Sequence, residues 1–186
     1  PSERLLQILE NLTSDPNNMV YIITGRSEEQ MTEFVGHVKG LGIACEHGFY
    51  CRHPNQIEFT TSLYNIDPES LAWIEMVKPI LEHVTSRTPG SFTEVKNSSL
   101  VFHYRNADPD YGEWSANELK LHLEMSFNSQ PLEIIRGRNK VIEIRPQSVS
   151  KGACTRKLIE KGDYSFIFCC GDDNTDESMF EEVERH

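Results

Sequence analysis

The sequence lacks the features of a membrane, nucleic-acid-binding or disulfide-bonded secreted protein. No apolar run is long enough to cross a bilayer, and the N-terminus does not resemble a secretion signal. Only 18 Lys and Arg oppose 29 Asp and Glu, and the net charge of −11 argues against nucleic acid or an anionic membrane as a partner. Five cysteines, an odd number without metal-ligand spacing, argue against a disulfide framework. We therefore expect a cytoplasmic protein, because the cytosol keeps thiols reduced.

The chain is long enough for one ordinary domain or two small ones. Its 186 residues are 38% hydrophobic and 25% charged, as in soluble globular proteins. No internal repeat or low-complexity segment stands out. If the ligand of so acidic a chain is itself an anion, a local cluster of cations together with a metal ion must attract it.

The first third predicts helices that alternate with strands. Ser2 is placed to cap a helix that ends before the loop of residues 14–18. Four leucines recur on one face of this helix and are predicted to be buried: Leu5, Leu6, Leu9 and Leu12. Residues 19–23 form a continuous apolar run, which predicts a strand in a sheet covered on both faces. Residues 43–45 predict a second, short strand.

Residues of the kind that bind ligands follow both of these strands. Thr24-Gly25-Arg26 comes after the first strand, and Ser27 with Gln30 forms a capping box that starts a helix. A hydroxyl, a glycine and the first turn of a helix can bind an anion, although a plain turn has the same composition. Glu46 and His47 come after the second strand, where a lone histidine is more often structural than catalytic.

The composition changes near residue 53, and the segment from there to residue 145 predicts a module of helix, hairpin, helix and hairpin. The first helix starts at residues 67–69, and the second starts at a capping box of Ser115 with Glu118. The two hairpins are predicted to pair residues 92–96 with 99–105, and residues 132–136 with 140–145. This order predicts a small α+β module with its own core.

The predicted strand of residues 99–105 has two different faces. One face suits packing on helices: Leu100, Phe102 and Tyr104. The other face ends in a guanidinium: Val101, His103 and Arg105. Glu94 and Lys96 share a face of the neighbouring strand. The charged face suits ligand binding, but an ordinary solvated face with cross-strand ion pairs has the same pattern.

The last third contains a crowded group of acidic residues. The apolar run of residues 164–170 predicts a buried strand, in which two cysteines act as small hydrophobes. Asp172, Asp173 and Asp176 follow it, just before a helix. Carboxylates crowded at the end of a strand suit magnesium, although an N-cap with an acidic first turn also contains aspartates. We predict a magnesium site at these three residues.

Lys151 lies in the first turn of another predicted helix, residues 151–161, which precedes the aspartates. A lysine at this end opposes the helix dipole. Most lysines are simply solvated. A lysine in this place is also suited to hold a phosphoryl oxygen, so both interpretations stay open.

Three separated pieces resemble the second, third and fourth motifs of the haloacid-dehalogenase-like (HAD) phosphatases. They are Thr24-Gly25-Arg26, Lys151-Gly152, and Gly171-Asp172-Asp173 with Asp176. Longer stretches are similar to trehalose-6-phosphate phosphatase: residues 46–48, 94–96, 101–108, 141–146 and 171–177. The resemblance covers nearly the whole chain.

This resemblance implies an α/β fold in which a Rossmann-like HAD core carries an inserted α/β cap of the C2 type. The core would comprise residues 1–52 and 146–186, and the cap residues 53–145. The resemblance also implies magnesium-dependent hydrolysis of trehalose 6-phosphate to trehalose and phosphate, in trehalose biosynthesis. In the family an aspartate attacks phosphorus, and water then clears the aspartyl-phosphate.

The resemblance also implies residue roles. Thr24 would hydrogen-bond a phosphoryl oxygen, and Lys151 would hold the same group and stabilise the transition state. Asp172 would ligate magnesium, with Asp173 and Asp176 as further ligands or as neighbours of the ligands. Substrate contacts would come from both domains: Arg26, Glu46, His47, Glu94, Lys96, Arg105, Lys140 and Glu143. The basic pair that the family carries near the second hairpin turn falls on Arg138, Asn139 and Lys140, and which of these reaches the substrate is open.

The family's first motif, Asp-x-Asp-Gly-Thr, supplies the nucleophile and the general acid and does not occur in this sequence. We expect it on a strand just before Pro1. Two alternatives therefore remain. One is a non-catalytic phosphatase-like subunit that partners trehalose-6-phosphate synthase subunits. The other is a HAD phosphatase that acts on another sugar phosphate.

Overall fold

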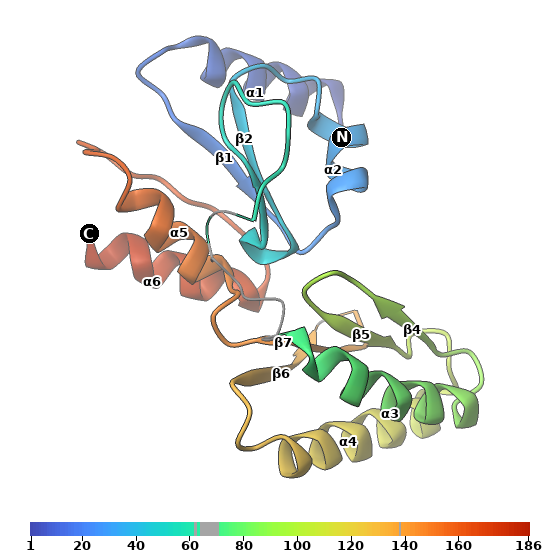
Figure 1. Cartoon of the computed structure of the whole chain (residues 1–186). Coiled ribbons are helices and arrows are strands. Elements are labelled where there is room, and N and C mark those ends of the chain that lie inside the picture. Colours follow the sequence, from blue (N-terminus) through green and yellow to red (C-terminus); the bar gives the residue numbers. More distant parts are fainter. Residues whose placement is uncertain (62, 64–70, 138) are drawn as a thin grey trace. The chain divides into compact units, whose positions relative to one another are not determined.

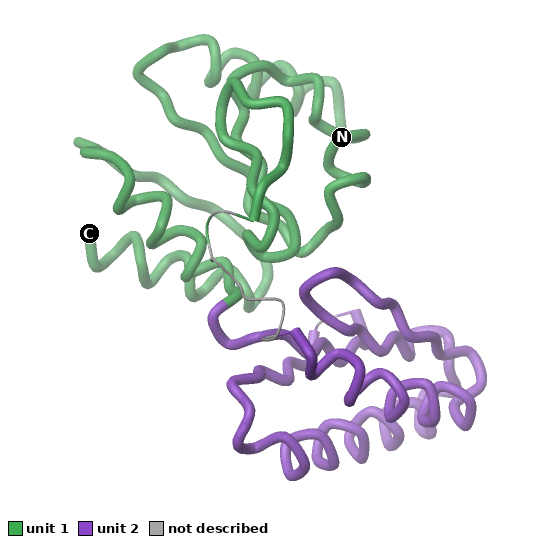
Figure 2. Tube along the Cα trace, in the orientation of Figure 1, with its two compact units in different colours: residues 1–65, 149–186 green, residues 66–148 purple. Residues whose placement is uncertain are grey.

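The computed structural model describes the chain except for residues 62, 64–70 and 138 (Figure 1). The chain divides into two compact units (Figure 2). Unit 1 comprises residues 1–65 and 149–186, and unit 2 comprises residues 66–148. Within the described ranges, no helix has both the length and the apolar content needed to span a bilayer.

Unit 1 contains a three-stranded sheet in the order β1 (Val20–Ile23), β2 (Leu41–Cys45) and β3 (Tyr50–Arg52). β1 and β2 are parallel, whereas β2 and β3 are antiparallel. α2 (Glu28–Val35) connects the parallel pair, and its N-terminus has the predicted reciprocal capping box of Ser27 and Gln30. The strands predicted in this third of the chain are confirmed.

The core of unit 1 lies on both faces of β2, whose five residues are all buried. Leu41, Ile43 and Cys45 pack with residues of α1 (Glu3–Ser14) and α2. Ala44, on the opposite face, packs with Cys154 and other residues of a second cluster. This double covering explains why β2 is apolar throughout instead of alternating.

The prediction for the first helix is only partly correct. Ser2 caps α1 as predicted, its hydroxyl accepting from the N–H of Leu5 at 3.3 Å. Leu9 is buried and Leu6 packs against the same cluster, but Leu5 and Leu12 are each 44% exposed. Successive helical residues are about 100° apart, so a helix rotated to bury Leu6 and Leu9 turns the other two leucines aside.

The C-terminal part of unit 1 is a pair of packed helices, α5 (Lys151–Ile159) and α6 (Glu177–Arg185). Ser150 caps α5 by accepting from the N–H of Ala153 at 3.1 Å. The helices meet at Gly152, whose N–H donates to the Ser178 hydroxyl at 3.1 Å. A Cβ at this position would lie 2.6 Å from the carbonyl oxygen of Ser178, so the close approach requires glycine.

The predicted buried strand of residues 164–170 is wrong, because this segment has no regular secondary structure. Phe166 and Phe168 are 80% and 76% exposed, Cys170 is exposed and Cys169 is half-buried. None of the strands in the described part of unit 1 pairs with the segment. A strand needs a neighbour that satisfies its backbone N–H and C=O groups, so an apolar sequence alone does not form one.

Unit 2 contains an antiparallel sheet in the order β4 (Phe92–Val95), β5 (Leu100–His103), β7 (Val141–Pro146) and β6 (Leu132–Gly137). α3 (Trp73–Arg87) and α4 (Pro109–Ser126) cover one face of it (Figure 1). The core lies between helices and sheet and includes the predicted inward face of β5 with the residue after it: Leu100, Phe102 and Tyr104. Both predicted hairpins are therefore confirmed.

The second helix of this unit starts earlier than predicted. Asp108 caps α4, its carboxylate accepting from the N–H groups of Asp110 at 3.1 Å and Tyr111 at 2.9 Å, and Pro109 follows at the first position. The expected start at Ser115 lies inside the helix, where this residue is 5% exposed. An Asp-Pro start fixes the first turn more strongly than the internal Ser-x-x-Glu pattern, so the predicted helix start at Ser115 is wrong.

The division into units falls later than the boundary expected from composition. Unit 2 begins at residue 66 instead of 53 and ends at residue 148 instead of 145. Cys51 and Thr60 exchange backbone hydrogen bonds at 2.8 and 2.9 Å, and Leu63 is buried in a cluster of unit 1. These contacts hold the segment after β3 to the first unit. The predicted helix start at residues 67–69 lies outside the described residues.

The exposure of Phe166 and Phe168 gives a test of the corrected fold. In the 186-residue chain, Phe166→Ser and Phe168→Ser should change the free energy of unfolding by no more than about 0.5 kcal/mol, because neither ring is removed from water. Ile43→Ala, at a residue that is fully buried, should lower it by about 2–5 kcal/mol. Urea unfolding followed by circular dichroism measures both. Serine variants as unstable as Ile43→Ala would contradict the exposed segment and support the buried strand predicted from the sequence.

Candidate active site

The turns that follow β1 and β2 interlock at the carboxyl edge of the unit 1 sheet. The N–H of His47 donates to the carbonyl of Thr24 at 2.8 Å, and the N–H of Glu46 donates to the carbonyl of Arg26 at 3.0 Å. The N–H of Thr24 in turn donates to the carbonyl of Ala44 in β2 at 2.9 Å. Two groups of site residues predicted from separate parts of the sequence are thus side by side, at the edge where α/β sheets bind ligands.

The turn after β2 has a strained backbone. Glu46, His47 and Gly48 have φ angles of 46°, 59° and 94°, in a region that residues with a side chain rarely adopt. The two side chains are nearly buried, at 3% and 5% exposure. A Cβ on Gly25 would lie 2.9 Å from Nε2 of His47, so the imidazole fills the space beside this glycine. Strain of this kind persists where the surrounding structure holds it, and it is common at active sites.

Thr24 and Arg26 have local partners in the first turn. The Thr24 hydroxyl accepts from the N–H of Arg26 at 3.2 Å, which closes the turn. The Arg26 guanidinium lies over the ring of Phe34 in α2, 5.3 Å from its centroid, a cation–π arrangement. The turn therefore presents a hydroxyl and a cation at the start of a helix, which is suitable for an anion.

Lys151 and Asp176 form an ion pair at the start of α5. The ammonium nitrogen lies 2.5 Å from Oδ1 of Asp176, and the two side chains are only 11% and 7% exposed. Oδ2 of Asp176 accepts from the N–H groups of Asp172 at 3.0 Å and Asp173 at 2.9 Å. Burial raises the pKa of the Asp176 carboxyl, but the hydrogen bonds from Lys151 and from these N–H groups together lower it below its usual value. This carboxylate is therefore ionised at neutral pH.

The three aspartates predicted to bind magnesium differ in their surroundings. Asp172 is exposed and Asp173 half-buried, whereas Asp176 faces Lys151 and the backbone. Among the described residues, no group of three His, Cys, Asp or Glu side chains is arranged to hold a metal ion. The donors are the hard oxygens that magnesium prefers, but magnesium needs near-octahedral coordination. The fit is therefore partial, because the described aspartates could supply only some of the six ligands.

The open face of the unit 2 sheet, opposite α3 and α4, carries a second set of predicted site residues. Glu94 pairs with Val101, and Val101 pairs with Glu143, so the two glutamates lie on the same face on either side of β5. The Thr93 hydroxyl lies 2.8 Å from that of Thr85 in α3, which places the neighbouring position of β4 on the helix side. This arrangement is the one that the alternation of the sequence predicted.

The basic residues of unit 2 lie where strands end. Lys96 is in the turn between β4 and β5, and its N–H donates to the carbonyl of Ser99 at 2.9 Å. The N–H of Tyr104 donates to the carbonyl of Lys140 at 3.0 Å, which places the exposed Arg105 near the turn that contains Lys140. Arg138 lies outside the described residues, so which basic residue of this turn contacts a substrate stays a prediction.

Two interactions of the site were not predicted from the sequence. The first is the ion pair of Asp176 with Lys151, since Asp176 was predicted only as one of three magnesium-binding aspartates. The second is the contact of His103 with Glu94, at 2.8 Å. The first has no sequence signal, because the two residues belong to different helices. The second had one: in the predicted hairpin, His103 is one diagonal step from Glu94 on the same face.

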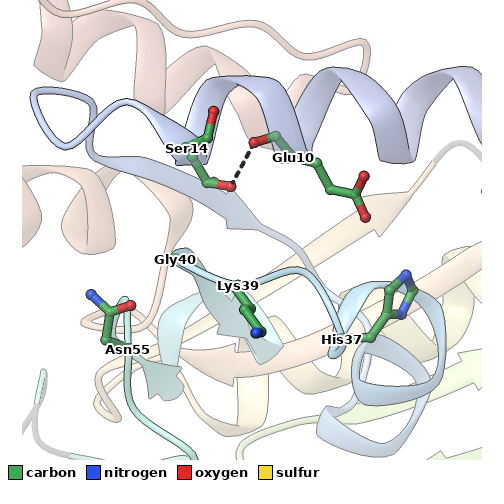
Figure 3. Close-up of a pocket in the computed structure, with 7 residues that line it drawn as sticks. Glu10, Ser14, His37, Lys39, Gly40 and Asn55 are labelled. Atoms are coloured by element: carbon green, nitrogen blue, oxygen red, sulfur yellow. Dashed lines mark hydrogen bonds between the residues drawn. The ribbon is translucent and has the colours of Figure 1, made fainter.

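A hollow of about 360 Å³ lies on another side of unit 1 (Figure 3). It is lined by Glu10 and Ser14 of α1, by His37 and Lys39 before β2, and by Asn55. His37 and Lys39 directly precede the amino end of β2, whereas Thr24 and Glu46 follow the carboxyl ends of their strands. The hollow contains none of the predicted site residues.

The fold and the arrangement of unit 1 define a class of protein. Unit 1 has a parallel strand–helix–strand crossover with a hydroxyl after the first strand. A lysine lies at the start of a later helix, and aspartates precede the next helix. This combination is that of the HAD-like phosphatase fold. The family described as Trehalose-phosphatase matches residues 1–186, and the chain belongs to that family.

Similar proteins include enzymes and a regulatory protein. The chain is 40% identical over 180 residues to "Alpha,alpha-trehalose-phosphate synthase (UDP-forming) B" of Dictyostelium discoideum, covering 97% of this chain and 22% of the relative. It is 39% identical to "Probable alpha,alpha-trehalose-phosphate synthase (UDP-forming) 10" of Arabidopsis thaliana, covering 98% of this chain and 21% of the relative. The chain thus spans about a fifth of the length of these curated relatives.

Two solved structures from Candida albicans have the same fold. The C-terminal domain of trehalose-6-phosphate phosphatase matches with a TM-score of 0.86 and 32% identity, covering 100% of this chain and 66% of that chain. The C-terminal domain of trehalose synthase regulatory protein matches with a TM-score of 0.74, covering 97% of this chain and 73% of that chain. The second likeness, at 16% identity, concerns the fold alone.

The Lys151–Asp176 pair should be energetically coupled. Lys151→Met and Asp176→Asn should each lower the free energy of unfolding by about 1–3 kcal/mol, because each leaves a nearly buried polar group without its partner. The double variant should be less unstable than the sum of the two, by about 0.5–3 kcal/mol. The same cycle on Glu181 and Arg185, each 63% exposed, is the matched control and should give a smaller coupling. Additive effects at Lys151 and Asp176 would contradict the pair.

Proposed function

We propose that this chain is the phosphatase part of an enzyme that hydrolyses trehalose 6-phosphate to trehalose and phosphate with magnesium. The observation that carries the proposal is the placement of Lys151. Its ammonium is nearly buried, fixed by Asp176 and set at the start of α5. α5 also contacts the turn of residues 46–48, which interlocks with Thr24. A fixed and nearly buried cation is suited to the charge of a phosphoryl group in its transition state.

Different residues of unit 1 bind different oxygens of the phosphoryl group in this proposal. Thr24 donates its hydroxyl hydrogen to one phosphoryl oxygen, and Lys151 donates to another. Arg26 provides a further cation at the entrance of the same turn. Asp172 would hold magnesium, with Asp173 beside it, and a bound magnesium ion offsets phosphoryl charge. The remaining oxygen ligands, the nucleophile and the general acid would belong to the Asp-x-Asp-Gly-Thr motif, which does not occur in these 186 residues.

Unit 2 is proposed to act as the cap that recognises the sugar. Glu94 and Glu143 accept hydrogen bonds from sugar hydroxyls, and Lys96, Arg105 and Lys140 donate to sugar oxygens. The support is the register that sets both glutamates on the open face of the sheet. A disaccharide carries many hydroxyls and little charge, so a row of acceptors and donors on a rigid sheet suits it.

A second candidate is a non-catalytic subunit that binds a phosphorylated sugar inside a trehalose-synthesis complex with synthase subunits. The observation that favours it is that the curated relatives carry the name of the synthase and are about five times as long as this chain. The two candidates differ in one property. Only the first requires an Asp-x-Asp motif on the intact protein.

The catalytic role of Lys151 can be tested by phosphate release. The 186-residue chain should release no phosphate from trehalose 6-phosphate, because it lacks the nucleophile, whereas the intact protein with an Asp-x-Asp motif should do so. In the intact protein, Lys151→Met should lower kcat by about 10²–10³-fold, as expected when a donor to the transition state is removed. Malachite-green detection of phosphate measures both.

Lys39→Met, at an exposed lysine of the hollow in Figure 3, is the matched control and should leave kcat unchanged. Turnover by the short chain that disappears in Lys151→Met would overturn the nucleophile assignment. An intact protein with Asp-x-Asp that binds the substrate but does not hydrolyse it would favour the non-catalytic subunit.

The proposed cap can be tested by substrate selectivity. Arg105→Ala and Glu143→Ala should lower kcat/KM for trehalose 6-phosphate by about 10–100-fold, because each removes a polar partner of the sugar. Hydrolysis of a small ester such as p-nitrophenyl phosphate, which has no trehalose group, should change little. Equal losses on both substrates would place these residues in the chemistry or in the fold, contrary to the proposal.

A further inference from the structure

His103 holds the carboxylate of Glu94 on the open face of the unit 2 sheet. Nε2 of His103 lies 2.8 Å from Oε2 of Glu94. An ionised carboxylate only accepts hydrogen bonds, so the imidazole is the donor, through Nε2–H. A hydrogen bond to a charged group is stronger than one between neutral groups. The position of this glutamate oxygen is therefore set by a neighbour and not by the glutamate alone.

Phe92 holds the imidazole in turn. The two rings are stacked, with centroids 4.3 Å apart and planes inclined by only 6°. The pairing of β4 with β5 produces this contact, because Phe92 is directly opposite His103. Glu94 follows two residues later on the same face, where its carboxylate reaches Nε2 of the imidazole. The three residues thus form one unit, which we call the histidine clamp: Phe92, Glu94 and His103.

The histidine clamp is not explained by the hydrophobic core. Phe92 is 51% exposed and does not belong to the core cluster of unit 2. The side chains of Glu94 and His103 are 40% and 26% exposed. An exposed glutamate samples several rotamers, and a ligand that needs one of them must lose that freedom on binding. A glutamate already fixed by a stacked histidine avoids this loss.

We propose that His103 is a positioning residue for substrate recognition: it orients the Glu94 carboxylate toward a hydroxyl of the sugar, with Phe92 supporting the imidazole. The ligand class is a hydroxyl-rich sugar phosphate, and the proposal rests on the proposed function of the chain. His103 itself does not touch the reacting phosphoryl group. Its effect is on the affinity for the sugar, because the clamp sets one acceptor of the sugar site before the substrate arrives.

Substitutions of His103 by asparagine and by glutamine test its positioning role in the intact protein. The amide nitrogen of glutamine occupies about the same place as Nε2 of histidine, whereas that of asparagine reaches only as far as Nδ1. His103→Asn should therefore raise KM for trehalose 6-phosphate about tenfold, with kcat and the hydrolysis of p-nitrophenyl phosphate unchanged. His103→Gln should restore KM to near the wild-type value. Phe92→Leu should raise KM less than His103→Asn does.

His122→Asn is the matched control, because His122 is an exposed histidine of α4 in the same unit. It should change neither KM nor kcat. Equal KM values for wild type, His103→Asn and His103→Gln would overturn the proposal. Loss of p-nitrophenyl phosphate hydrolysis in both His103 variants, with a lowered unfolding midpoint, would also overturn it, because the residue would then support the fold.

The proposed function and the proposed role of His103 can fail independently of each other. If the intact wild-type protein binds trehalose 6-phosphate without hydrolysing it, the hydrolase proposal fails and the clamp is tested by Kd from calorimetry instead. The same ranking is then expected, with the Kd of His103→Asn about tenfold above that of wild type and that of His103→Gln close to it. A wild-type protein that neither binds nor hydrolyses this substrate refutes both proposals.

Discussion

The ion pair of Lys151 and Asp176 is the contact on which the C-terminal half of unit 1 depends. One oxygen of the Asp176 carboxylate faces the ammonium, and the other accepts from the backbone N–H groups of Asp172 and Asp173. A single side chain therefore fixes both the cation at the start of α5 and the path of the chain into α6. The pair can form because Gly152 lets the two helices approach, through the bond of its N–H to Ser178. The segment of residues 172–176, the packed helices α5 and α6 and the Lys151 ammonium are therefore held in place by the same contacts.

The same pair constrains how an anion can be bound. Because Asp176 is ionised, it offsets the charge of Lys151, and the pair contributes oriented donors and little net charge. An ammonium has three N–H donors, one of which is directed at Asp176. The whole chain carries a net charge of −11, which repels a phosphate ester at long range. Attraction must then come from other cations near the turn of Thr24, such as Arg26 and a bound divalent ion. The proposed magnesium ion would serve the charge balance as well as the chemistry.

Sequence patterns predicted the elements that are fixed by local chemistry. The capping box of Ser27, the hairpins of unit 2 and the two faces of β5 depend on residues close together in the chain, and they were confirmed. The start of α4 was missed although its Asp-Pro cap is local, but the other failures occurred where a distant partner decides. Residues 164–170 have the composition of a buried strand but no strand to pair with in the described part of unit 1. The role of Asp176 depends on a lysine in another helix, and the left-handed turn at His47 brings its imidazole against Gly25, which lies in the turn after a different strand. None of these partners can be read from a local window.

The two units solve the problem of fixing a polar side chain in different ways. In unit 1 the polar groups are nearly buried, so burial itself makes an unpaired group costly and a paired one rigid. In unit 2 the glutamates of the open face remain accessible, and solvent alone would leave them mobile. There, order comes from cross-strand neighbours: the sheet register sets Phe92 opposite His103, and the imidazole reaches Glu94. A site for a neutral, hydroxyl-rich group must stay accessible to water-soluble ligands and yet be ordered. Stacking and hydrogen bonding along a sheet surface satisfy both conditions, which a buried ion pair cannot do.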